Sequence, residues 1–329
     1  MYKTGLATSQ AENSIIPTLH NAAYQESGLD WRYEVYPCND ASDFAALIQT
    51  AKREGSGFVG LDVSDSFIKD ANRLALSRSQ DAALLKAADV LTFNAGSMRS
   101  FAGAFADNAF GQAAISVLQR VGQGLSAKSV VVYGDGPRSA AIILELARAG
   151  IASLTIVSAD CRAAEAQARM LFQGLARQRI ELVSRSMIAA NRNALVQWNN
   201  SMGELIKQEA PQIALSTVGY EQASEALARA DVLISTVSWE NGGADLADLA
   251  GSLAAETPSG MIVLDVCPNQ AHEPSQVLSR AAVWPAGAVV LDNLELSIEQ
   301  AALSIGIWAS ALGFDTADPR PAMRTAVGL

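Results

Sequence analysis

The stretch GDGPRS at residues 134–139 has the residue types and spacing that suit phosphate binding. Gly134 and Gly136 allow a tight turn and let the backbone approach a pyrophosphate closely. Pro137 suits the first position of a helix, where its missing N–H costs nothing, and that helix would point free N–H groups at the phosphates. Ser139 stands where the full pattern has a third glycine. The sequence therefore predicts a dinucleotide site.

The next predicted strand, SLTIVSAD (153–160), ends in an acid that can bind the ribose of the cofactor. A carboxylate at Asp160 would accept hydrogen bonds from the ribose hydroxyls and repel a 2′-phosphate, which favours NAD over NADP. Arg162 favours the opposite choice, because a guanidinium can hold that phosphate. Asp160 can also simply cap the next helix. We predict NAD, with NADP open. The predicted cofactor-binding residues are Gly134, Gly136, Pro137, Arg138, Ser139, Asp160 and Thr236.

A single lysine, Lys69, ends the stretch GLDVSDSFIK (60–69), after a strand-like start and a polar turn. A lysine at this place can transfer protons in a redox reaction, or it can be a solvated residue at the end of the strand. No Gly-x-Ser-x-Gly motif or Cys/His pairing supports a hydrolase. Which of the two roles Lys69 has decides whether the chain is an oxidoreductase.

Strands and helices that alternate along the chain must position these residues. WRYEVYPC (31–38) and GFVGLDV (57–63) predict strands on either side of an amphipathic helix at 40–55, a βαβ unit typical of a parallel sheet. Residues 186–217 predict an inserted helix or lid. Further strands are predicted at 129–133, 153–160, 179–186, 230–238 and 260–268, and helices at 110–124, 163–177 and 296–314.

Length and composition bound the class of protein. The 329 residues favour two domains, and the net charge of −10 argues against a nucleic-acid partner. The three cysteines form no CxxC pair and only two histidines are present, so we expect reduced thiols and no metal site. The N-terminus lacks the apolar segment of a secretory signal, and no apolar run of ~18 residues exists. We expect a cytoplasmic protein that binds no membrane.

Motifs along nearly the whole chain occur in the order found in one known family. They are IIPTLHNAAYQESGLDWRYEVYP (15–37), GLDVSDSFIK (60–69), GAFAD (103–107), GDGPRSAA (134–141), DVLIST (231–236) and NLELSIEQAA (293–302). In this order the chain resembles the shikimate/quinate dehydrogenase family. The resemblance implies an α/β protein with an N-terminal βαβ substrate domain, a Rossmann-like nucleotide-binding domain and a C-terminal helix that returns to the first domain. The implied boundaries are 1–107, completed by 293–329, and 108–292.

The resemblance also implies the residues that handle the substrate. In the family a lysine and an aspartate serve in proton transfer while hydride passes to the nicotinamide. The aspartate matches Asp107, whereas the lysine position matches Ile68 and Lys69 follows one residue later. We predict Asp107 and Lys69 as catalytic, with a helix cap and a surface lysine as the respective alternatives. The implied substrate-binding residues are Ser14, Ser64, Thr92 and Gln300.

Four positions that carry polar groups in the family are apolar here, namely Ile16, Ile68, Leu91 and Phe105. Each lost partner of a substrate hydroxyl or carboxylate would cost about 1–3 kcal/mol. We therefore expect an NAD(P)-dependent oxidoreductase of secondary metabolism that acts on a substrate other than shikimate, a small molecule with a hydroxyl/ketone or an amine/imine pair. The alternatives are a relative that has lost redox turnover and a lyase or isomerase. A homodimer is left open.

Overall fold

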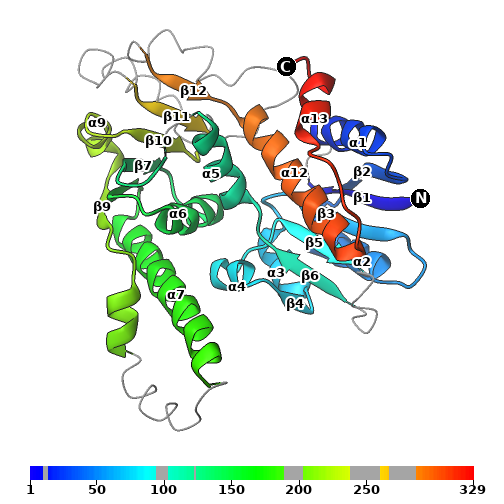
Figure 1. Ribbon diagram of the computed structural model, residues 1–329, viewed down its shortest axis with the longest axis horizontal. Helices are drawn as coiled ribbons and strands as arrows, with labels where there is room; N and C mark the ends of the chain where they lie inside the picture. The colour runs from blue at the N-terminus through cyan, green and yellow to red at the C-terminus, as the bar shows by residue number, and fades with distance from the viewer. Residues whose placement is uncertain (10–13, 94–102, 122–123, 189–202, 238–259, 267–286) are drawn as a thin grey trace. The chain divides into compact units, whose positions relative to one another are not determined.

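A computed structural model describes residues 1–9, 14–93, 103–121, 124–188, 203–237, 260–266 and 287–329. The chain forms two compact units, whose elements are labelled in Figure 1. Unit 1 comprises Met1–Val117, Pro268–Ser275 and Asp292–Leu329, and unit 2 comprises Leu118–Cys267 and Gln276–Leu291. The end of the chain therefore returns to the unit that holds its beginning.

Unit 1 is built around a mixed sheet with the strand order β2-β1-β3-β5-β6-β4. β1 pairs in parallel with β2 and β3, whereas β5 pairs antiparallel with both β3 and β6. The carboxyl ends of β3 and β6 therefore meet the start of β5 at one edge of the sheet. The strands are β1 (Tyr2–Thr8), β2 (Trp31–Pro37), β3 (Phe58–Val63), β4 (Ser77–Arg78), β5 (Val90–Phe93) and β6 (Ala104–Asp107).

Helices cover both faces of this sheet, and each face has its own hydrophobic core. Val90 and Leu91, neighbours in β5, belong to different cores because successive strand residues point to opposite faces. The Leu91 core contains residues of α2 (Ala41–Ala51), α3 (Ile68–Leu74) and α4 (Gln80–Leu85), and the Val90 core contains residues of α1 (Ile16–Glu26), α12 (Asn293–Leu312) and α13 (Arg320–Ala326).

A glycine in β3 lets α12 approach the sheet closely. A Cβ at Gly60 would lie 2.0 Å from Trp308 Nε1, so any other residue would push the helix away. Trp308 is completely buried and its Nε1 donates a hydrogen bond to the Leu91 carbonyl oxygen at 3.1 Å. This contact fixes the height of α12 over the sheet and so places the polar residues of α12 near the ends of β3 and β5.

Unit 2 contains a sheet with the order β12-β11-β10-β7-β8-β9, in which every described pair is parallel. Its strands are β7 (Ser129–Tyr133), β8 (Ser153–Val157), β9 (Ala214–Val218), β10 (Val232–Ser235), β11 (Ile262–Asp265) and β12 (Val289–Leu291). α6 (Pro137–Ala149) connects β7 to β8, and α7 (Cys161–Ile188) follows β8. α5 (Phe110–Arg120) links the two units, and α9 (Ala223–Leu227) precedes β10.

The predicted α/β architecture, with its Rossmann-like second part and returning C-terminal helix, is confirmed. The strand predicted at 179–186 is wrong, because these residues continue α7, and no glycine or proline follows Gly174 to end the helix. The strands β1, β4, β6, β9 and β12 were not predicted. β1 and β9 contain polar residues, and β9 is only partly buried, so neither shows the apolar alternation that identifies a strand. No described helix is long and apolar enough to cross a membrane.

Candidate functional site

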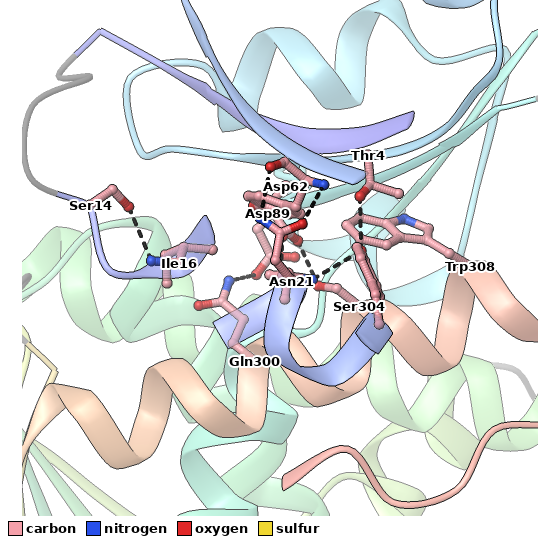
Figure 2. A network of polar contacts seen from close by, with 12 residues as sticks. Thr4, Ser14, Ile16, Asn21, Asp62, Asp89, Gln300, Ser304 and Trp308 are labelled. Carbon is pink, nitrogen blue, oxygen red and sulfur yellow. Dashed lines mark hydrogen bonds and ion pairs between the residues drawn. The ribbon is translucent and has the colours of Figure 1, made fainter. Parts of the chain in front are cut away.

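A buried polar network surrounds Asp62 in unit 1 (Figure 2). Asp62 Oδ1 accepts a hydrogen bond from Ser304 Oγ of α12 at 2.6 Å, and Oδ2 accepts one from the Tyr33 hydroxyl of β2 at 2.8 Å. His20 Nε2 of α1 lies 3.1 Å from the same Oδ2, off the line of a hydrogen bond. Because a buried carboxylate needs partners, the network ties α1, β2, β3 and α12 together.

His20 is held from several sides and has no exposed surface. Its ring stacks on Tyr33 with the centroids 4.0 Å apart, and its Nδ1 lies 3.2 Å from the Tyr24 hydroxyl. That hydroxyl in turn lies 2.8 Å from Thr4 Oγ1. These contacts give His20 a structural role at the centre of the helix and sheet packing.

Asp89 is a second buried carboxylate at this edge, directly before β5. It accepts hydrogen bonds from the backbone N–H groups of Ala109 and Phe110, both at 2.8 Å, and so caps the start of α5. Gln300 Nε2 of α12 donates to Asp89 Oδ2 at 3.3 Å. Burial raises the pKa of Asp89 to about 7, the charges of Asp62 and Asp107 add to the rise, and the two N–H groups oppose it.

Asp107 stands at the end of β6 and is half-buried. Its Oδ1 accepts a hydrogen bond from the next backbone N–H, that of Asn108, at 2.8 Å. Its carbonyl oxygen accepts one from the Asp89 N–H at 3.1 Å. The two backbone N–H groups at the start of α5, those of Ala109 and Phe110, donate to Asp89 and not to Asp107. The Asp107 carboxylate is therefore not engaged as the cap of α5.

Lys69 lies in the first turn of α3, where its side chain is exposed. The preceding residue, Ile68, is 5% exposed and packs in the core that also contains Leu91, Phe44 and Phe67. The two neighbours therefore point apart, as expected for consecutive residues of a helix. Ile68 and Leu91 are thus both buried in this core.

The four predicted substrate-binding residues all lie in unit 1. The hydroxyl oxygens of Ser64 and Thr92 are buried and have no hydrogen-bond partner among the described residues. Ser14 Oγ lies before α1 and accepts a hydrogen bond from Ile16 N at 3.4 Å, and Gln300 binds Asp89, as Figure 2 shows. In the described part of the chain, no group of three or more His, Cys, Asp or Glu side chains could hold a metal ion.

The glycine turn of unit 2 has the shape that its sequence predicts. Gly134 and Gly136 have φ values of +108° and +109°, which residues with a Cβ rarely adopt. A Cβ at Gly134 would lie 2.5 Å from Thr236 Oγ1, whereas one at Gly136 would meet nothing within 4 Å. Pro137 begins α6, and no side chain caps this helix. The open space at Gly136 and the uncapped helix end fit a pyrophosphate.

The polar side chains of the turn brace it from within unit 2. Ser139 is buried, and its Oγ donates to the Gly134 carbonyl oxygen at 3.1 Å and lies 2.7 Å from Thr236 Oγ1. Thr236 Oγ1 also donates to the Tyr133 carbonyl oxygen at 3.1 Å. Arg138 Nη1 donates to the Val266 carbonyl oxygen at 2.8 Å. These three residues hold the turn against the ends of β10 and β11.

Asp160 is exposed and caps α7, because its Oδ1 accepts a hydrogen bond from the Ala163 N–H at 3.0 Å. Ser158 directly follows β8 and contacts Asp135, which follows β7. Its Oγ accepts a hydrogen bond from the Asp160 N–H at 3.0 Å and donates one to Asp135 Oδ2 at 2.5 Å. The helix-capping alternative for Asp160 is thus realised, while its role toward a ribose stays a prediction.

Sequence reasoning missed two carboxylates. Asp89 precedes the apolar run VLTF, and a single charge at the start of a buried strand is a signal of a partnered or functional group. Asp135 occupies the variable position between the two glycines of the turn, where the motif itself gives no information. Only the fold brings Asp135 to the end of β8.

No protein-family model matches the chain. Among curated proteins, the shikimate dehydrogenase (NADP(+)) of Psychrobacter cryohalolentis is 31% identical over 157 residues, which cover 45% of this chain and 54% of that protein. The chain thus spans about half the length of the curated relatives it matches.

Solved structures match over nearly the whole chain. The shikimate dehydrogenase of Mycobacterium tuberculosis superimposes with a TM-score of 0.68 at 24% identity, covering 100% of this chain and 99% of the other. The 5-ketofructose reductase of a Gluconobacter strain gives a TM-score of 0.65 at 22% identity, covering 99% and 98%. At these identities the likeness shows the fold.

Proposed function

We propose that this chain, which is similar to shikimate dehydrogenases in part of its sequence and in its fold, is an NAD(P)-dependent oxidoreductase of a small hydroxyl/ketone or amine/imine substrate other than shikimate. The observation that carries the proposal is the glycine turn between β7 and α6. Two positive φ values, open space at Gly136 and an uncapped helix end occur together there. This combination suits the pyrophosphate of a dinucleotide.

Unit 2 holds the cofactor in this proposal. The backbone of Gly134 and Gly136 and the first turn of α6 bind the pyrophosphate, and Arg138, Ser139 and Thr236 keep the turn in place. The nicotinamide supplies one chemical step, the exchange of a hydride with a substrate carbon. We expect NAD rather than NADP, because carboxylates lie near the end of β8.

Unit 1 binds the substrate and moves the proton. The buried hydroxyls of Ser64 and Thr92 each gain a partner when a polar substrate binds, since they have none among the described protein groups. Asp107 takes the proton from the substrate hydroxyl or amine during oxidation and returns it during reduction. Lys69 is the second proton-transfer candidate, although its side chain is exposed and Ile68 occupies the neighbouring core position.

The proposal of a substrate other than shikimate is supported by four apolar residues at positions that carry polar groups in the shikimate/quinate dehydrogenase family. Ile16 and Phe105 are partly buried apolar residues, and Ile68 and Leu91 are packed in the core. Fewer donors and acceptors remain for a polyhydroxylated acid, so a substrate with fewer polar groups binds better. The Gluconobacter protein, which has a similar fold, is named a 5-ketofructose reductase. The fold is therefore not limited to shikimate dehydrogenases.

The first test is a fluorescence titration of the purified protein with NADH and with NADPH. We expect micromolar affinity for NADH, and absence of binding to either nucleotide by the folded protein would refute the proposal. A panel of hydroxy acids, polyols and amino compounds is then assayed for NAD(P)H turnover. Asp107→Asn is expected to lower kcat at least 100-fold. The kcat of Lys69→Ala is compared with that of Lys207→Ala, a control at another exposed lysine.

A further inference from the structure

The middle residue of the glycine turn, Asp135, carries a charge at an exposed position between Gly134 and Gly136. Its carboxylate is not free to swing, because Ser158 Oγ donates to its Oδ2 at 2.5 Å. Ser158 itself is completely buried, and its Oγ is held by the Asp160 N–H at 3.0 Å. A chain of two hydrogen bonds thus fixes the Asp135 carboxylate at the carboxyl end of β8.

We propose that Asp135 is the specificity-determining residue that makes this protein prefer NAD over NADP, an inference that rests on the proposed function. The two cofactors differ only in a phosphate on the adenosine ribose, and in this fold the ribose lies at the end of the second strand of the domain, which is β8 here. A carboxylate fixed at that place accepts hydrogen bonds from ribose hydroxyls and repels a 2′-phosphate.

Asp160 is the obvious rival, since it follows β8 in the sequence. However, Asp160 Oδ1 is used to cap α7 through the Ala163 N–H. The capping bond holds the Asp160 carboxylate at the helix start, whereas the Asp135 carboxylate lies in the phosphate-binding turn itself. The Asp135 charge also acts on Tyr220. The pKa of the Tyr220 hydroxyl is raised mainly by burial and, to a smaller extent, by the charge of Asp135.

Arg162 would favour the opposite preference. It lies in the first turn of α7 with an exposed side chain, and a guanidinium there can attract a 2′-phosphate. Among the described residues no hydrogen bond or ion pair holds the Arg162 guanidinium, whereas Asp135 is held by Ser158. We therefore expect the fixed carboxylate to decide the preference. The curated relative from Psychrobacter bears NADP(+) in its name, so the preference would distinguish this chain.

The experiment is a comparison of dissociation constants for NADH and NADPH, measured by fluorescence titration of the full chain at low ionic strength. The variants are Asp135→Asn, Asp160→Asn and Arg162→Ala. Asp135→Asn keeps an acceptor for Ser158 Oγ and removes only the charge. Asp160→Asn tests the rival carboxylate without disturbing the helix, because asparagine caps helices as well as aspartate does. Circular dichroism verifies that each variant is folded.

We expect the wild type to bind NADH more tightly than NADPH. Asp135→Asn should shift the ratio of the two dissociation constants at least tenfold toward NADPH, Asp160→Asn less than threefold, and Arg162→Ala should change it little. An unchanged ratio in Asp135→Asn, or a larger shift in Asp160→Asn or Arg162→Ala, overturns the assignment while leaving the proposed function intact. If the folded wild type binds neither nucleotide, both fall together.

Discussion

The buried carboxyl of Asp89 should make the stability of the protein fall as the pH rises. Its pKa is raised from the ordinary 3.8 to about 7 by burial and by the charges of Asp62 and Asp107. A raised pKa means that the folded state binds more protons than the unfolded state between these two values. The stabilising contribution of the protonated carboxyl is therefore complete below pH 4 and is lost as the pH rises through 7.

The size of the effect follows from the same two values. A rise of about three pKa units corresponds to about 4 kcal/mol of unfolding free energy, of which more than half is lost between pH 5 and pH 8. Asp89→Asn removes the titration. It also removes one acceptor from the N–H groups of Ala109 and Phe110, which adds a cost that is independent of pH.

The assay is urea unfolding of the wild type and Asp89→Asn at pH 5, 6, 7 and 8. Titrations of groups distant from Asp89 occur in both proteins and cancel in the difference. The wild type should be more stable than the variant at pH 5, and this advantage should shrink by about 2–3 kcal/mol by pH 8. Asp315→Asn, at an exposed carboxyl, is the control and should follow the wild type. An advantage of the wild type that stays constant or grows with pH would refute the reasoning.

Two further predictions concern the packing of α12 and the glycine turn. Arg320→Ala should lower the unfolding free energy by about 3–5 kcal/mol, because Arg320 binds the fully buried Glu299 at 2.7 and 3.0 Å. Arg324→Ala, which breaks the more exposed pair with Glu295, should cost about 1 kcal/mol or less in the same urea assay. Gly134→Ala should abolish NADH binding in a fluorescence titration, whereas the control Gly124→Ala should not. Of the two alanines, only the one at 134 would contact Thr236 and require a strained φ. Equal affinities of the two variants for NADH would contradict this.

The parts of the fold that the sequence could predict are those whose signal is local. The SVVVY strand, the two glycines and Pro137 specify β7, the turn and the start of α6 within a dozen residues. The resemblance added the order of the units and the return of α12. β9 was missed because an edge strand buries few of its side chains, and alternation therefore leaves little trace in the sequence.

The missing parts of the site depend on contacts between distant segments. Asp89 acquires its partners from α5 and α12, about 20 and 211 positions away along the chain, and no spacing rule links such residues. The positions of Ile68 and Leu91 were predicted to border the substrate because the motifs aligned there. Both residues are buried in the core beside Phe44, an environment that the motifs alone could not predict.

The three carboxylates at the edge of the unit 1 sheet differ in how fully they are engaged, and this difference indicates which of them can do chemistry. Asp62 accepts from Tyr33 and Ser304, and Asp89 accepts from two backbone N–H groups and Gln300. Asp107 accepts only from the adjacent N–H among the described residues. The two N–H bonds lower the pKa of Asp89, but burial and the neighbouring charges outweigh them and raise it to about 7. Because Asp62 and Asp89 already accept several hydrogen bonds from the protein, we propose that the proton-transfer role belongs to Asp107, the carboxylate with the fewest described contacts.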